Sequence, residues 1–168
     1  MTNSIKTFSN YFAILLLTSF LAACATAPTE TTSSSSTNQS QVVGGVYVGT
    51  ETIEMLAVDV PDRVFFAYDS YSLAASAQAT LNKQAKWLKA NPSVAIAVEG
   101  HADERGTREY NLALGDRRAS SVKDYLMSQG ISSNRISTIS YGKERPVKSG
   151  SNDTAWAQNR RSVSVRTN

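Results

Sequence analysis

Cysteine and histidine are almost absent from this chain. Its 168 residues include one cysteine, Cys24, and one histidine, His101, so no disulfide can form within the chain. Zinc catalysis takes about three protein ligands, and the single histidine has no second His or Cys in the C-terminal part of the chain. The Gly-x-Ser-x-Gly motif of one class of serine hydrolases is also missing. These absences argue against a disulfide scaffold and against the common hydrolytic sites.

Basic residues are missing between Ala25 and Val60. Of the 17 Lys and Arg residues, all except Lys6 follow Pro61. A basic C-terminal part suits an anionic partner such as nucleic acid, a lipid surface or an acidic wall polymer. Charge alone leaves these alternatives open.

The chain lacks a hydrophobic run long enough for a transmembrane helix. Its longest run, from Tyr11 to Ala23, falls short of the roughly 20 apolar residues that span a bilayer. Lys6 precedes this run without any acid, as in an export signal. The polar tract that follows gives a buried core helix nothing to pack on. We therefore expect residues 1–23 to be a signal peptide.

The single cysteine stands directly after this run. The segment Leu21-Ala22-Ala23-Cys24 resembles the lipobox of bacterial lipoproteins. The alternative is a chance cysteine after an ordinary cleavage site, which would leave a free thiol in an oxidising compartment. The resemblance implies acyl chains on Cys24, and a stable anchor needs more than one chain. Because Ala25 rather than Asp follows, it also implies the outer membrane, on its periplasmic face.

Residues 24–55 are expected to be the lipidated cysteine and a disordered polar tether. The stretch 31–41 contains no apolar residue and cannot offset the entropy cost of ordering. The stretch 42–48 is more apolar and includes Gly44-Gly45, and the sequence does not decide whether it forms a strand. A folded domain is expected over residues 56–168.

From Leu56 onward, apolar residues recur at the spacings typical of strands and helices. A tight turn at Pro61-Asp62 is expected between the first two strands. In order, we expect strands at 56–60 and 63–68, a helix ending at Asn91-Pro92, a strand through Val94, Ile96 and Val98, a helix at 109–129, a strand at 136–141, a short helix at 154–160 and a closing strand around Val163 and Val165. This order indicates an α/β two-layer sandwich, with helices packed on one face of a mixed sheet.

Each long helix has a recognisable apolar face and end signals. Ser72 or Ser76 is expected to cap the first helix, and Gly130 to follow the second as its C′ residue. The expected core residues are Ala77, Leu81, Ala85 and Leu88 on the first helix, and Leu114, Ala119, Val122 and Leu126 on the second.

Several separated motifs occur in one order within this domain. They are Val98-Glu99-Gly100-His101-Ala102-Asp103-Glu104-Arg105-Gly106-Thr107, Glu109-Tyr110-Asn111, Leu114-Gly115-Asp116-Arg117-Arg118-Ala119, Ser140-Tyr141-Gly142-Lys143-Glu144 and Asn159-Arg160-Arg161. The set resembles the OmpA-like domain family, and within it the peptidoglycan-associated lipoproteins (Pal). The resemblance covers about residues 64–165. It implies an OmpA-like fold and non-catalytic binding of peptidoglycan, without a cofactor or metal.

The ligand of that family is the peptide stem of peptidoglycan, whose diaminopimelate ends in an ammonium and a carboxylate. Such a group requires one fixed anion and one fixed cation, and Arg and Asp suit these roles. The resemblance places them on Asp103, at the end of the central strand, and on Arg118, on the following helix. Gly100 is expected to let the ligand approach the backbone. The supporting residues that the resemblance implies are Tyr68, Asp69, Gly100, Arg105, Thr107, Asn111 and Leu114.

The sequence also allows purely structural roles for these residues. Asp103 and Arg118 could pair with each other. His101 is expected in a core or supporting role rather than in catalysis. Variants lacking Asp103 or Arg118 are expected to lose wall binding with little loss of folding. The remaining charged and aromatic residues of the motifs are expected to be solvated or wall-facing (Arg117, Arg160, Arg161) or half-buried packing (Tyr110).

The resemblance also implies partners. These are peptidoglycan, the outer membrane through acyl chains on Cys24, and the proteins TolB and TolA, with a role of the Tol–Pal system in envelope integrity and cell division. Nucleic acid is not expected for an exported chain. The alternatives are another OmpA-like wall-binding lipoprotein without Tol partners, or a peptidoglycan hydrolase that uses His101 and Asp103.

Overall fold

The computed structural model describes residues 42–43, 45–47 and 55–167. The expected signal peptide, Cys24 and most of the expected tether lie outside the described residues. The chain divides into two units, Met1–Ser35 and Ser36–Asn168, and every described residue belongs to the second. Within the described ranges, no helix has the length and apolar character needed to cross a bilayer.

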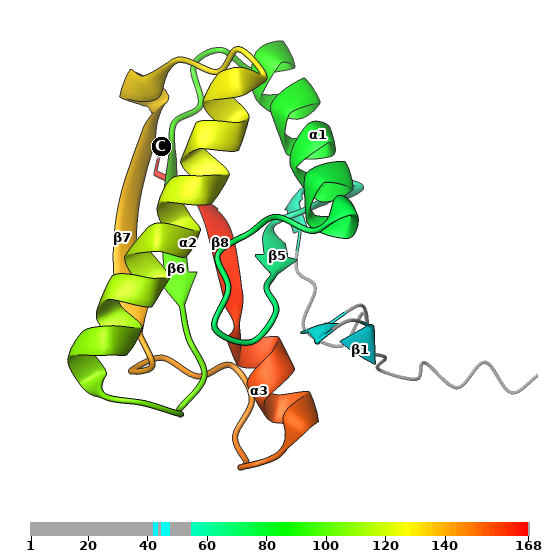
Figure 1. The fold of residues 1–168 in the computed structure, drawn as a ribbon. Coiled ribbons are helices and arrows are strands. Elements are labelled where there is room, and N and C mark those ends of the chain that lie inside the picture. Colours follow the sequence, from blue (N-terminus) through cyan, green and yellow to red (C-terminus); the bar gives the residue numbers. More distant parts are fainter. Residues whose placement is uncertain (1–41, 44, 48–54, 168) are drawn as a thin grey trace, which may run out of the picture. The chain divides into compact units, whose positions relative to one another are not determined.

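The second unit is an α/β domain built around a four-stranded sheet (Figure 1). In chain order its elements are β1 (Val42–Val43), β2 (Val46–Tyr47), β3 (Met55–Ala57), β4 (Val60–Pro61), β5 (Arg63–Phe65), α1 (Ala75–Ala90), β6 (Ile96–His101), α2 (Arg108–Ser128), the 3-10 helix η1 (Ser133–Arg135), β7 (Ile136–Gly142), α3 (Asp153–Asn159) and β8 (Arg161–Arg166).

The sheet has the strand order β5-β8-β6-β7. Strands β6 and β7 are parallel because α2 crosses between them, whereas β8 is antiparallel to both of its neighbours. Helices α1 and α2 lie on the same face of the sheet, and α3 lies at the end where β8 begins (Figure 1). The expected two-layer α/β sandwich with a mixed sheet is confirmed.

The expected apolar faces of both long helices form the core. Every core residue expected on α1 and α2 is buried, at 5% exposure or less. The helices also contribute polar side chains to the interior. On α1, Gln84 donates to the carbonyl of Pro61 at 2.7 Å and accepts from the Ser164 hydroxyl at 2.8 Å, which ties the helix to two strands. Gly130 follows α2 with φ +89°, as expected for a C′ glycine.

Two local predictions were wrong. The first turn lies at Val58–Asp59, where Asp59 has φ 58°, and not at Pro61-Asp62, because Asp tolerates the left-handed region. Pro61 belongs to the short strand β4 instead. The N-cap of α1 is Ala74, which makes no side-chain hydrogen bond, so core packing rather than a serine cap fixes the start of this helix.

Part of the expected tether is folded against the domain. Strands β1 and β2 form a small antiparallel hairpin. Val46 is 8% exposed and packs in a cluster with Phe65 and Ala157. The folded unit therefore extends N-terminal to residue 56, the boundary expected from the sequence.

Candidate functional site

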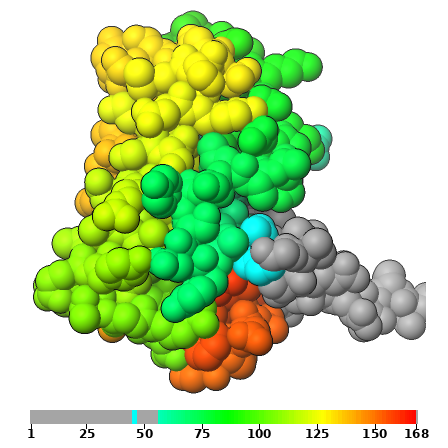
Figure 2. Space-filling view, in the orientation of Figure 1, coloured from blue at the N-terminus to red at the C-terminus, as the bar shows by residue number. Residues whose placement is uncertain are grey.

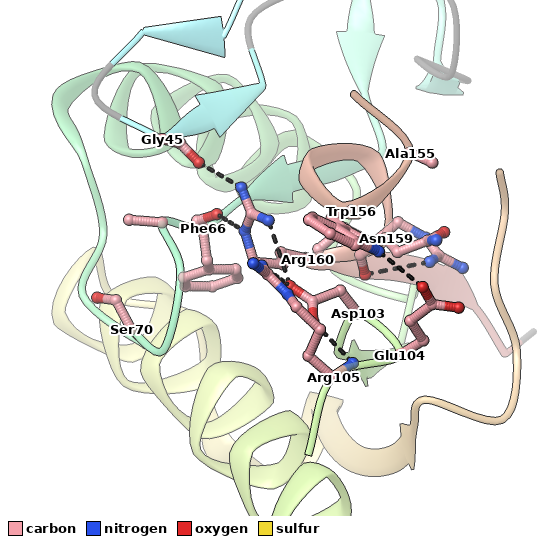
Figure 3. A network of polar contacts seen from close by, with 12 residues as sticks. Gly45, Phe66, Ser70, Asp103, Glu104, Arg105, Ala155, Trp156, Asn159 and Arg160 are labelled. Carbon is pink, nitrogen blue, oxygen red and sulfur yellow. Dashed lines mark hydrogen bonds and ion pairs between the residues drawn. The ribbon is translucent and has the colours of Figure 1, made fainter. Parts of the chain in front are cut away.

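Asp103 lies in the loop that follows β6 and is 4% exposed. Its Oδ1 accepts from the backbone N–H of Arg105 at 3.1 Å and from Nε of Arg105 at 3.1 Å. Its Oδ2 accepts from Nη2 of Arg105 at 2.7 Å and from Nη1 of Arg160 at 3.2 Å (Figure 3). Burial alone would raise the pKa of this carboxyl group, but the hydrogen bonds from Arg105 outweigh burial and the pKa lies below its usual range. Asp103 is therefore a fixed anion.

Arg105 covers this carboxylate from the outer side. Its guanidinium carbon lies 4.1 Å from the ring centroid of Tyr68 and 4.1 Å from that of Trp156, a double cation–π arrangement. Trp156 is held in turn by a 2.9 Å hydrogen bond from its indole N–H to Glu104 (Figure 3). The Arg105 side chain is nevertheless 32% exposed.

Arg118 is completely buried on α2. Its Nε donates to the carbonyl of Ser70 at 2.8 Å, its Nη1 to that of His101 at 2.8 Å and its Nη2 to that of Ala67 at 3.2 Å. The residues just before α1, teal to green in Figure 2, lie on the surface against α2. Burial, followed by repulsion from Arg160, lowers the pKa of Arg118 to about 10, so the side chain is charged at neutral pH. It binds the loop before α1 to the end of β6 and does not pair with Asp103.

An open cavity of about 380 Å³ brings the expected residues together. Eight of the nine residues expected at the ligand site line it. The lining consists of Tyr68, Asp69, Asp103, Arg105, Gly106, Thr107, Tyr110, Asn111, Leu114 and Arg118. The residues come from the loops after β5 and β6 and from α2, so the site forms where three elements converge.

Thr107 and Asn111 shape the loop after β6. The Thr107 hydroxyl caps α2 by accepting from the backbone N–H of Tyr110 at 3.2 Å. The Asn111 side chain donates to the carbonyl of Arg105 at 2.8 Å. These two contacts fix the path of the segment that carries Asp103 and Arg105.

Gly100 is the expected site residue that does not line the cavity. A Cβ atom at this position would lie 1.8 Å from the carbonyl oxygen of Gly115. The backbone of α2, and not a ligand, takes up the space that the glycine leaves. Gly100 was expected to let the ligand approach the backbone, and this was wrong. A glycine is needed here because α2 crosses β6 closely.

Tyr110 was expected as packing but stands at the cavity rim. It is 47% exposed, and its hydroxyl donates to Asp69, a residue with φ 50°. A signal was present in the sequence: Tyr110, Leu114 and Arg118 are spaced four apart and so share one helix face. All three line the cavity.

Arg160 and Arg161 were expected as solvated charges, and this was wrong. They are 4% and 6% exposed. Arg160 donates to Asp103, to the carbonyl of Phe66 at 3.1 Å and to that of Gly45 at 2.6 Å. Arg161 donates to the carbonyl of Arg145 at 3.2 Å. Both side chains are buried and bonded within the fold, whereas Arg117 is exposed as expected.

His101 ends β6 and is 1% exposed. Neither ring nitrogen makes a hydrogen bond within the described structure, although Glu99 lies 3.5 Å from Nε2. Burial, with the nearby charges of Arg161, Arg145 and Arg63, lowers the pKa of His101 to about 3 and outweighs Glu99. The neutral, buried ring agrees with the expected core role. Over the described ranges, no cluster of three His, Cys, Asp or Glu residues is placed to hold a metal ion.

We expect His101 to make the fold acid-sensitive. Below pH 6.5 the unfolded histidine binds a proton that the folded one, with its pKa of about 3, does not bind. The free energy of unfolding should therefore fall by up to about 1.4 kcal/mol per pH unit below 6.5. His101→Phe removes this term, so its urea-unfolding free energy should depend less steeply on pH between 6.5 and 4. Parallel curves for the variant and the unaltered chain would contradict the assignment.

The model of the OmpA family matches residues 65–160, a range that contains every residue lining the cavity. The chain belongs to the OmpA family. The family resemblance that the sequence motifs indicated is confirmed.

Individual relatives agree with this membership of the OmpA family. The peptidoglycan-associated lipoprotein of Brucella melitensis biotype 1 is 59% identical over 108 residues, which are 64% of this chain and 64% of that protein. The match thus spans less than two thirds of the length of that curated relative.

Solved structures give the same fold. The peptidoglycan-associated lipoprotein from Burkholderia pseudomallei is 43% identical with a TM-score of 0.62, over 63% of this chain and 90% of that chain. The cell wall anchor of the T6SS from Pseudomonas aeruginosa is 27% identical with a TM-score of 0.52, over 62% of this chain and 82% of that chain. The OmpA-like arrangement of sheet and helices is shared with both.

Proposed function

We propose that this chain is a non-catalytic lipoprotein that binds the diaminopimelate of peptidoglycan stem peptides and tethers the outer membrane to the cell wall. The observation that carries the proposal is that the buried anion Asp103 lines a cavity together with Arg105 and Arg118. A volume of about 380 Å³ lies at the small end of ligand sites, which run from about 300 to 1,000 Å³. Relatives named peptidoglycan-associated lipoprotein support the same assignment.

The hydrogen bonds of Asp103 define how the ligand ammonium enters. A carboxylate offers about four lone-pair sites, and Arg105 and Arg160 fill all four. An ammonium can therefore bind Asp103 only when a donor leaves. The side chain of Arg105 is 32% exposed and that of Arg160 is 5% exposed, so Arg105 is the donor that moves.

The displaced Arg105 then needs a new anion, which the ligand supplies. The carboxylate beside the ammonium can take the guanidinium of Arg105 while it also faces Arg118. The guanidinium of Arg118 has five N–H groups, more than its three carbonyl bonds use. Binding thus exchanges one internal ion pair for two ligand ion pairs. A ligand with only the ammonium would leave Arg105 without an anionic partner, so the site selects the zwitterion.

The remaining parts of the proposal concern location and partners. Acylated Cys24 anchors the chain in the outer membrane, and the segment after it spans to the wall. A single site is expected to bind with a dissociation constant on the order of micromolar, and many lipidated copies on one wall hold by avidity. As a Tol–Pal component that supports envelope integrity and cell division, the chain also binds TolB and TolA. Capture by purified TolB separates this role from that of a wall-binding lipoprotein without Tol partners.

Two kinds of purified wall test the binding chemistry. The chain should be retained by diaminopimelate-type sacculi and at least about tenfold less by lysine-type wall, because lysine lacks the terminal carboxylate and one charge-assisted pair is worth about 1.5–3 kcal/mol. The supernatant should contain no released muropeptides. Equal retention by both walls would contradict the paired-charge site, and muropeptide release that depends on His101 would favour a hydrolase.

A further inference from the structure

Arg160 connects the candidate site to the N-terminal segment. One guanidinium donates to three acceptors: the Asp103 carboxylate, the carbonyl of Phe66 and the carbonyl of Gly45 (Figure 3). The bond to Gly45 is 2.6 Å long and spans 115 positions of the sequence. The segment that leads toward Cys24 is thus bonded to the same side chain that supports the anion of the site.

The contact with the N-terminal segment includes apolar packing. Val46 is 8% exposed and packs with Phe65 and with the fully buried Ala157, which lies on α3. Ala67, in the loop after β5, also packs against this cluster, and it directly precedes Tyr68, which lines the cavity. The segment therefore touches the support of the site at two places, Arg160 and the loop after β5.

Arg160 stands behind Asp103 with respect to the cavity. It does not line the cavity, whereas Asp103 and Arg105 do. A ligand that replaces Arg105 leaves the three bonds of Arg160 in place. When the N-terminal segment leaves, however, Nη2 of Arg160 loses its acceptor, the carbonyl of Gly45. The guanidinium is then held by Phe66 alone, and the position from which Nη1 donates to Asp103 is less well fixed. Docking of the segment therefore fixes Arg160, and Arg160 in turn holds Asp103 in the position in which it binds the ligand.

We propose that Arg160 is a positioning residue through which docking of residues 45–46 and ligand binding at Asp103 favour each other. This inference rests on the proposed function of the cavity. Coupling between two sites is reciprocal: the docked segment raises the affinity for the stem peptide, and the stem peptide raises the population of the docked segment. Wall attachment thus shortens the free part of the tether by fixing residues 45–46 on the domain.

Val46→Asp in the full-length acylated chain, held in detergent, tests the coupling. It places a charge in the cluster with Phe65 and Ala157 and so releases the segment without altering any residue that lines the cavity. The matched control is Val58→Asp, since Val58 is 88% exposed. By calorimetry with a diaminopimelate tripeptide stem, Val46→Asp should weaken binding about fivefold or more, and Val58→Asp should not change it. Circular dichroism establishes that both variants remain folded.

Two further measurements separate positioning from general stability. The amides of Val46 and Tyr47 should exchange with deuterium more slowly when the stem peptide is bound. Arg160→Lys keeps the charge but replaces the planar guanidinium, whose three nitrogens each reach a different acceptor, with one compact ammonium. In that background the effect of Val46→Asp should disappear. Equal affinities of the Val46→Asp and Val58→Asp variants, or unchanged amide exchange, would overturn the coupling alone. Absence of binding by the unaltered chain would overturn the proposed function and the coupling with it.

Discussion

Asp103→Asn is expected to reduce the affinity for diaminopimelate stem peptides by about 100-fold or more. The amide keeps the shape of the side chain but removes the charge that the ligand ammonium binds. It also adds an N–H donor that faces Arg105 and Arg160, which now bond to the carboxylate. A charge-assisted bond is worth about 1.5–3 kcal/mol, and 1.4 kcal/mol is tenfold in affinity. Ligand binding and internal support are therefore weakened together.

The same variant is expected to remain folded. Its amide oxygen still accepts a hydrogen bond from Arg105, so the free energy of unfolding should fall by about 1–3 kcal/mol, less than the total of a typical domain. The matched control is Asp116→Asn, because Asp116 is an exposed carboxylate on α2. Sacculus pull-down and calorimetry measure binding, and urea unfolding measures stability. Retained affinity in a folded Asp103→Asn chain would sink the assignment of the anion.

Periodic burial made most of the fold predictable from the sequence. The spacing of Leu81 and Leu88 on α1, and of Val122 and Leu126 on α2, identifies the core face of each helix, and all four side chains are buried. The local error at Pro61 had a different cause. Both Asp59 and Pro61 are residue types that favour turns, and the sequence pattern does not show which of them forms the turn. In the structure Asp59 adopts the left-handed conformation that the turn requires.

The site was predictable as a set of residues but not as a network. Asp103 and Arg118 were expected to face one ligand, and both line the cavity. Their bonding partners could not be inferred, because they are backbone carbonyls and side chains brought together by the tertiary fold. Arg160 is an example. A charged residue next to a strand usually faces water, but this one is buried because α3, the loop after β5 and Gly45 surround it.

Arg118→Ala is expected to lower the free energy of unfolding by about 3 kcal/mol, because three carbonyl groups lose the donor that the buried guanidinium supplies. The truncation leaves the buried carbonyl of His101 and the part-buried carbonyls of Ser70 and Ala67 without the donor that now satisfies them. A fully buried unpaired group costs about 1–3 kcal/mol. It also leaves a cavity beneath the loop before α1. The structure thus predicts a larger loss of folding for a variant lacking Arg118 than the sequence alone did.

The neighbouring arginine provides a matched control for this prediction. Arg117 is exposed on the next position of α2, so Arg117→Ala should change stability by no more than about 0.5 kcal/mol. Urea-unfolding curves of the two variants, recorded at pH 7, measure the difference directly. Because Arg118 holds the loop that carries Tyr68 and Asp69, its loss should abolish wall retention even where the chain is still folded. An Arg118→Ala chain as stable as the Arg117→Ala chain would contradict the structural role of Arg118, because its three bonds to carbonyl groups would then contribute nothing measurable to stability.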